Sequence, residues 1–177
     1  MAIRHRTKEV IAHDVAFVLN SPLNKLTKKA VLNNAAWAWT MFHGKKYDDC
    51  PYWSVEAKCY QVEHLYKCIE FEKADGRVSR PKRALIHNHA VPRRLVLQML
   101  FAMNPATPEE VFAICDKFLY GVVITPEEDR RLDAGGFRQK MPEEFWDQAS
   151  SEFENPWLRY RRCGIQLNPT PPKWLDQ

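Results

Sequence analysis

The tetrapeptide Thr-Pro-Glu-Glu occurs twice, at 107–110 and at 125–128, and fixes where two helices begin. In each copy the threonine hydroxyl can accept a hydrogen bond from a free backbone N–H, while the second glutamate reaches back toward the threonine N–H. Proline suits the first helical position because its missing N–H would be unpaired there. Between the two helices, the apolar run 122–124 predicts a short strand. This part of the chain therefore predicts a helix–strand–helix unit.

Periodic apolar residues predict further helices on both sides of this unit. Residues that recur every three to four positions form one face of a helix. Such helices are expected to end at glycine or before proline, because proline disfavours helical geometry in the residue that precedes it. The expected helices cover Lys8–Leu19, Leu26–Phe42, Val55–Ile69 with Ser54 as its cap and Gly76 as its stop, the segment after Pro92, and short segments after Pro142 and after Asn155-Pro156.

These elements predict a mainly α-helical fold of six to eight helices, with at most a small sheet of two or three strands. Hydrophobic residues make up 45% of the chain and aromatic residues 12%, which is too rich in large apolar side chains for a disordered protein. Residues 84–86 predict either a short strand or an extended segment. We expect a single globular domain over 1–167 and a proline-rich tail over 168–177.

The cysteines and the absence of long apolar runs predict a cytoplasmic protein. The five cysteines form neither a C-x-x-C pair nor a regular disulfide framework, which is typical of a reducing compartment. No run approaches the roughly 20 apolar residues that cross a bilayer, and no secretory signal is expected at the basic N-terminus.

The most distinctive segment is 77–94, which is rich in cations and holds no acidic residue, in a chain whose net charge is +4. A cluster of cations of this kind can line a track for the phosphates of a nucleic acid. The alternative is a solvated loop that is basic without binding anything. The residues concerned are Arg77, Arg80, Lys82, Arg83, Arg93 and Arg94, together with His87 and His89.

Within this segment, residues 86–92 read Ile-His-Asn-His-Ala-Val-Pro and resemble the first strand of the HNH nucleases. The resemblance implies a metal-dependent nuclease in which His89 is the general base. His87 or an acidic residue would then hold a divalent metal such as Mg²⁺. The chain departs from the HNH pattern because a helix is expected after Pro92 and no histidine follows His89. Asn104, Asp116 or a residue from elsewhere in the chain would have to complete the metal site, so the chain is not assigned to that family.

A second cluster of cations lies at 157–162, where aromatic residues alternate with Arg159, Arg161 and Arg162. Such mixtures bind single-stranded nucleic acid, because bases stack on aromatic rings while guanidinium groups contact phosphates. The alternative is a last helix that packs Trp157 and Tyr160 into the core and solvates its arginines. The spacing of these two aromatics favours the core.

The sequence thus predicts a nucleic-acid-associated protein, with metal-dependent cleavage as the enzymatic alternative. A third hypothesis is a non-enzymatic protein-interaction module that binds a protein partner through an aromatic-rich surface, since the chain has six tryptophans. No glycine-rich phosphate loop, nucleophile elbow or zinc-ligand pairing is present. The oligomeric state is left open.

Overall fold

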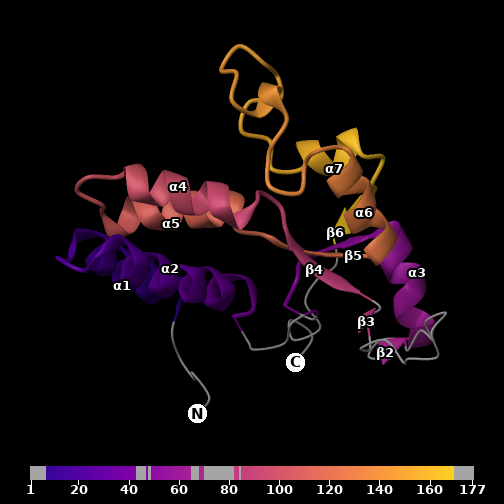
Figure 1. The fold of residues 1–177 in the computed structure, drawn as a ribbon, viewed down its shortest axis with the longest axis horizontal. Helices are drawn as coiled ribbons and strands as arrows, with labels where there is room; N and C mark the ends of the chain where they lie inside the picture. The colour runs from indigo at the N-terminus through magenta and orange to yellow at the C-terminus, as the bar shows by residue number, and fades with distance from the viewer. Residues whose placement is uncertain are drawn as a thin grey trace, which may run out of the picture.

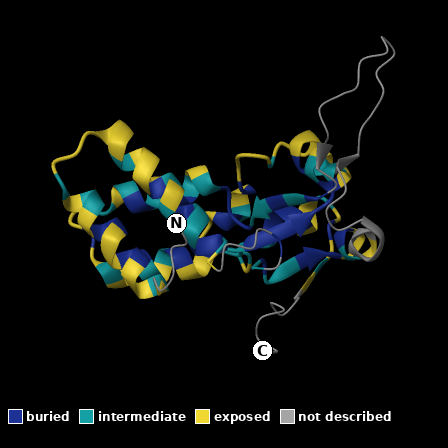
Figure 2. Cartoon of the chain, turned by 90° about the horizontal axis from the view of Figure 1, so that it is seen from below, coloured by how far each residue is buried: buried dark blue, intermediate teal, exposed yellow. Residues whose placement is uncertain are grey.

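The computed structural model describes residues 7–42, 47, 49–64, 68–69, 82–83 and 85–169; for 60–64, 68–69, 82–83 and 169 it describes the backbone alone. Figure 1 shows two parts side by side, a group of packed helices and a twisted sheet with helices around it. Figure 2 shows buried residues through the interior of both parts. Together the two parts form a single compact domain of mainly α-helical class, as predicted.

The helical part consists of α1 (Lys8–Asn20), α2 (Lys25–Thr40), α4 (Arg93–Ala102) and α5 (Pro108–Phe118). Its core is a continuous cluster of apolar side chains that are almost fully buried, to which all four helices contribute. Asn20 ties the turn after α1 to the turn before α5, since its side chain both donates to Ala106 O and accepts from Ala106 N. The buried residues that these helices contribute include Ile11, Leu32, Trp39, Leu100, Val111 and Phe118.

The second part contains a four-stranded sheet in the order β4 (Ile86–His89), β5 (Gly121–Ile124), β1 (Tyr52–Ser54), β6 (Leu167–Pro169). β5 runs antiparallel to β4 and parallel to β1, and β6 runs antiparallel to β1. All four residues of β5 are buried, which explains its uninterrupted apolar sequence. Two further short strands, β2 (Cys68–Ile69) and β3 (Lys82–Arg83), pair with each other.

Three helices lie beside this sheet: α3 (Val55–His64), α6 (Pro126–Ala134) and α7 (Leu158–Arg162), with a 3₁₀ turn at Glu143–Phe145. The buried carboxylate of Glu128 joins the first turns of α3 and α6. Its Oε2 atom accepts from Ser54 Oγ at 2.5 Å and from Thr125 N at 2.8 Å. Ser54 Oγ also accepts from Ala57 N at 2.9 Å, so it caps α3 as predicted.

Most predicted elements are confirmed. Both Thr-Pro-Glu-Glu segments form complete capping boxes at the starts of α5 and α6, and the predicted strand between them is β5. The helix after Pro92 is α4, and the short helix after Pro142 is the 3₁₀ turn. The sheet has four strands because β1 and β6 add to the expected pair. Each has only three residues, too few to show an alternating pattern.

The third helix was predicted too long. α3 ends at His64, and Cys68–Ile69 forms strand β2, whose partners are Lys82 and Arg83. Pairing with a distant segment replaces the helical hydrogen bonds that the apolar spacing favours, an instance of tertiary structure overriding local propensity. The predicted stop, Gly76, lies outside the described residues.

At the C-terminal end, β6 carries the chain in the sheet through Pro169, and the rest of the predicted tail, 170–177, lies outside the described residues. Among the helices that the structure describes, none is long and apolar enough to cross a membrane.

Candidate functional site

One face of α2 lines a pocket of about 970 Å³. The side chains that contribute follow each other at every fourth residue, which places them in one row along the helix. They are Lys25, Lys29, Asn33 and Trp37. Two lysines, an amide and an indole therefore share a single concave wall.

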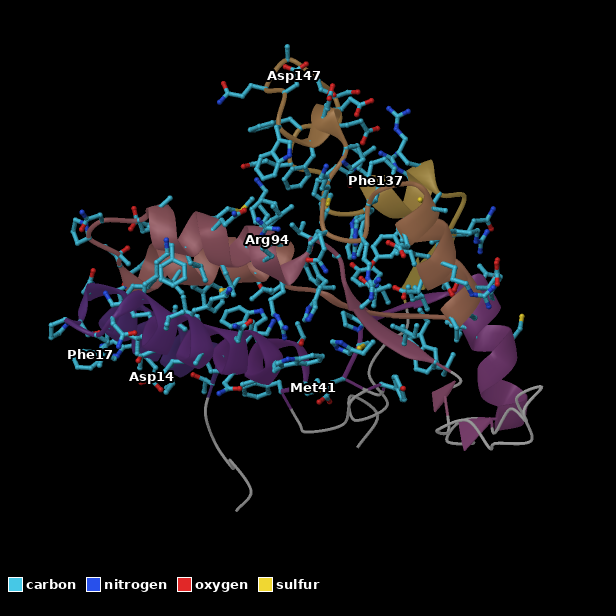
Figure 3. All side chains as sticks on the ribbon, viewed as in Figure 1. Asp14, Phe17, Met41, Arg94, Phe137 and Asp147 are labelled. Atoms are coloured by element: carbon cyan, nitrogen blue, oxygen red, sulfur yellow. The ribbon has the colours of Figure 1, made fainter. Side chains whose placement is uncertain are left out.

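The first residues of α4 and the strand before it form the facing wall and the floor. α4 contributes Arg93 and Arg94 from its first turn, followed one turn later by Leu97 and Gln98. Figure 3 shows Arg94 at the end of α4 that meets the sheet, with Phe137 on the loop beyond it. β4 supplies Ile86, His87, Asn88 and His89, and the remaining polar lining residues are Asp129, Arg138, Gln139 and Arg159.

The pocket is strongly cationic. Six of its lining residues are lysine or arginine, and Asp129 is the only acidic residue among them. Arg138 pairs with Asp133, with 3.6 Å between Nη1 and Oδ2. Within the described part of the chain, the other five cations have no carboxylate within 4.0 Å: Lys25, Lys29, Arg93, Arg94 and Arg159. Positive charge without local compensation attracts anions into such a concavity.

His87 and His89 face the same side of β4, as predicted from the two-residue period of a strand. Their ring centroids lie 5.2 Å apart and both rings contact Trp37, at 5.1 Å for His87 and 5.2 Å for His89. Arg93 covers the same indole, with its guanidinium carbon 5.1 Å from the ring centroid. Trp37 therefore ties α2 to both β4 and α4 at the floor of the pocket.

His89 is held in its neutral form. Both of its ring nitrogens are buried and have no hydrogen-bond partner among the described residues. Burial, assisted by the positive charges of His87, Arg93 and Arg159, lowers the pKa of His89 from 6.5 to about 3. An uncharged imidazole thus lies within a ring of cations.

The metal site implied by the HNH resemblance does not fit the described side chains. Among them, no group of three His, Cys, Asp or Glu residues is placed to hold a metal ion. Asp116 lies on α5 and pairs with Lys8 at 3.5 Å, and neither Asp116 nor Asn104 lines the pocket. The strand that carries the histidines is also followed directly by α4.

Arg159 lines the pocket although the residue as a whole is buried, with only 1% of its surface exposed. Its Nε donates to Ala90 O at 2.9 Å and its Nη1 to Phe137 O at 2.8 Å. Its Nη2 donates to the carbonyl of His89 and to Asn88 Oδ1. Because all its nitrogens are used within the protein, Arg159 adds charge to the pocket and fixes its shape, whereas the sequence had indicated a surface contact.

The structure brings together only part of the residues predicted to bind nucleic acid. Arg93, Arg94 and Arg159 line the pocket. Arg77 and Arg80 lie outside the described residues, and Lys82 and Arg83 are placed by their backbone alone, in β3.

Arg161 and Arg162 are exposed, pair with Glu152 and Glu144, and do not line the pocket. The two aromatics of this segment pack inward, as the core interpretation predicted: Tyr160 is fully buried and Trp157 packs on Tyr52 and Tyr120. That interpretation was wrong for Arg159, which is buried rather than solvated.

Sequence reasoning missed the α2 wall and Arg138. The signal for the α2 wall is present in the sequence, since Lys25, Lys29, Asn33 and Trp37 follow a strict four-residue spacing. The same helix also carries many apolar residues, so its sequence pattern indicates a buried helix rather than a polar wall.

Gly121 on β5 packs so closely against His87 and Cys50 that a side chain has no room there. A Cβ at this position would lie 2.8 Å from Cys50 Sγ and 2.9 Å from His87 Nε2. Cys50 is fully buried and cannot move aside. We expect Gly121→Ala to lower the free energy of unfolding by about 1–3 kcal/mol through overpacking, measured by urea denaturation.

The matched control for this prediction is a double-mutant cycle with Cys50→Ala. Removing the thiol relieves the closer of the two contacts that the new methyl group would make, so the double variant should be more stable than the sum of the single losses implies. Strict additivity would contradict the proposed clash.

Comparison of the chain with protein-family models, curated proteins and solved structures found no match. Its function is therefore inferred from the chemistry of the pocket.

Proposed function

We propose that this protein binds nucleic acid through the cationic pocket between α2, α4 and β4. The observation that carries the proposal is the convergence of six lysine and arginine side chains on one concavity that holds a single carboxylate. These cations come from four separate segments of the chain, so the cluster is a product of the fold rather than of one basic stretch. Phosphate groups are the anions that such clusters most often bind in nucleic-acid-binding proteins.

The cations exposed at the rim and the two that the fold holds in place have different tasks in this proposal. Lys25, Lys29 and Arg94 are exposed at the rim and can follow a phosphate backbone. Arg93 and Arg159 are held in place by Trp37 and by backbone carbonyls, respectively. They therefore contribute a fixed positive potential at the floor.

The test is a titration of labelled single- and double-stranded DNA and RNA, followed by fluorescence anisotropy at several salt concentrations. Binding should weaken steeply with salt, because each phosphate contact releases counterions. In the triple variant Lys25→Gln/Lys29→Gln/Arg94→Gln, we expect at least about a tenfold loss of affinity at low salt. The log–log salt slope should also become shallower by about two units, at roughly 0.7 per contact.

A charge-matched control separates the pocket from the overall charge. The variant Lys117→Gln/Arg161→Gln/Arg162→Gln removes three exposed cations that lie outside the pocket and pair with glutamates. Its affinity and salt slope should stay close to those of the parent protein. Equal losses in both triple variants, or no binding by the parent protein at low salt, would contradict the proposal.

Metal-dependent cleavage stays a prediction beside this proposal. His89 lines the pocket in neutral form, but a pKa of about 3 makes its imidazole a weak general base, and the described residues supply no complete set of metal ligands. Incubation of bound nucleic acid with Mg²⁺ tests it directly. If His89→Ala cleaves as fast as the parent protein, His89 is not the base.

The second candidate, a protein-interaction module, is favoured by exposed apolar side chains around the turn between α1 and α2. Phe17 is 71% exposed and Leu26 is 80% exposed, with Leu23 between them at 45%. Figure 3 shows Phe17 at the end of α1 that is remote from the sheet. The tryptophans contribute little to such a surface, since Trp146 is the only one among the described residues that is strongly exposed. If the parent protein binds none of the nucleic-acid probes, this surface becomes the leading site.

A further inference from the structure

The shape of the pocket limits which form of nucleic acid it can accept. Proteins read duplex DNA by inserting a protruding helix or a two-stranded ribbon into a groove. Here the cations line a concavity, and the concavity lies between two helices that form its rim. A hollow site needs a nucleic acid that itself protrudes, such as an unpaired nucleotide.

The volume of the pocket agrees with such a ligand. Pockets of roughly 300–1,000 Å³ enclose most of a small organic molecule, and this one measures about 970 Å³. It can therefore hold one or two nucleotides but not the width of a duplex.

The uncharged lining of the pocket has the chemistry to contact a base. Gln98 on α4 and Gln139 on the loop after α6 are exposed, and Asn33 lies on the α2 wall between Lys29 and Trp37. Carboxamide groups pair with the donor and acceptor edges of bases, which are accessible only in unpaired nucleotides or within a groove. The Arg93–Trp37 pair, with the guanidinium carbon 5.1 Å from the centroid of the indole ring, adds planar groups against which a base can lie.

Resting on the proposed function, we infer that the pocket recognises an unpaired nucleotide. Its base lies among the carboxamide groups and the Arg93–Trp37 pair, and its neighbouring phosphates lie on Lys25, Lys29 and Arg94. The ligand is accordingly a single strand or a nucleotide extruded from a duplex. Charged contacts to phosphates determine how steeply the affinity falls with salt. Uncharged contacts to the base determine the part of the affinity that does not depend on salt.

The experiment compares three probes of the same sequence, in DNA and in RNA: a single strand, a fully paired duplex, and a duplex with one bulged nucleotide. Binding is measured by fluorescence anisotropy at fixed salt. The single strand and the bulged duplex should bind at least about tenfold more tightly than the paired duplex. The comparison of DNA with RNA shows which sugar the pocket prefers.

The variant Gln98→Ala tests the base contact without changing charge. Gln98 is exposed on α4, so its replacement by a good helix former leaves the fold intact. We expect the affinity for the single strand to fall by several-fold up to about tenfold at every salt concentration, with the log–log slope unchanged. The control Gln148→Ala removes an exposed carboxamide that does not line the pocket and should have no effect.

The outcomes keep the two proposals apart. If the paired duplex binds as tightly as the single strand, and only the triple cation variant weakens binding, the proposed function holds and the unpaired-nucleotide inference is overturned. If Gln98→Ala weakens neither probe, the inference that the base lies among the carboxamides is overturned. If no probe binds, both proposals fail.

Discussion

Replacement of Arg159 with leucine is expected to lower the free energy of unfolding by about 3–4 kcal/mol, among the largest effects of any single substitution. The guanidinium is buried and donates to the carbonyls of Ala90, Phe137 and His89 and to the side chain of Asn88. Leucine leaves these buried acceptors without that donor, and each lost partner costs about 1–3 kcal/mol. Part of this loss is offset because the variant no longer has to bury the positive charge of the guanidinium. Urea denaturation measures the difference.

Two variants identify the cause of that loss. Arg159→Lys keeps the positive charge but replaces the planar fork with a single ammonium group, so it should recover only a small part of the stability. Arg161→Leu, two residues along the same helix, alters an exposed arginine and should change stability by less than about 0.5 kcal/mol. Full stability in Arg159→Lys would show that the charge, rather than the fork, is what the fold needs.

Stability should also fall on mild acidification because of His89. Its pKa is lowered to about 3 in the folded protein, whereas an unfolded chain titrates near 6.5. Between these values the unfolded state binds a proton that the folded state does not. Stability due to this group is therefore present above pH 6.5 and is lost as the pH falls. The expected loss is about 2 kcal/mol between pH 7 and pH 5.

The measurement is urea denaturation of the parent protein and of His89→Gln across this pH range. The variant has no titrating group at this position, so its stability should depend less on pH even if its absolute stability is lower. His13→Gln, which replaces an exposed histidine on α1, should keep the pH dependence of the parent. If His89→Gln and the parent lose stability in parallel, His89 is not the source.

The parts of the fold that sequence predicted well are those fixed by local chemistry. A capping box needs only four neighbouring residues, and both were confirmed in full. The strand β5 was found because its apolar run lies between those two fixed helices. The end of α3 could not be predicted in this way, because it depends on pairing between Cys68–Ile69 and Lys82–Arg83, segments far apart in the chain.

Only part of the pocket could be predicted from the sequence, because some of its residues are neighbours along the chain and others are not. Arg93, Arg94 and the two histidines lie within a few residues of one another, so their clustering shows along the chain. Lys25, Lys29 and Trp37 reach the same pocket only because α2 packs against α4. Arg138 belongs to a third segment, the loop after α6. The sequence also gave no sign that Arg159 would be buried among carbonyls, since an arginine between two aromatics is equally compatible with an exposed face.

Arg159 belongs both to the wall of the pocket and to the buried core. A substitution at this residue can therefore reduce activity either by altering the pocket or by unfolding the protein. A mutational screen scored by loss of activity would select Arg159, Tyr160 and Asn88 together, since they share one hydrogen-bond network. Abundance measured in the same cells distinguishes that group from the rim, because substitutions at the exposed Lys25, Lys29 and Arg94 should weaken the proposed nucleic-acid binding at normal protein levels. Substitutions at the rim would then change ligand binding while the protein stays folded. Substitutions around Arg159 would instead lower the amount of folded protein.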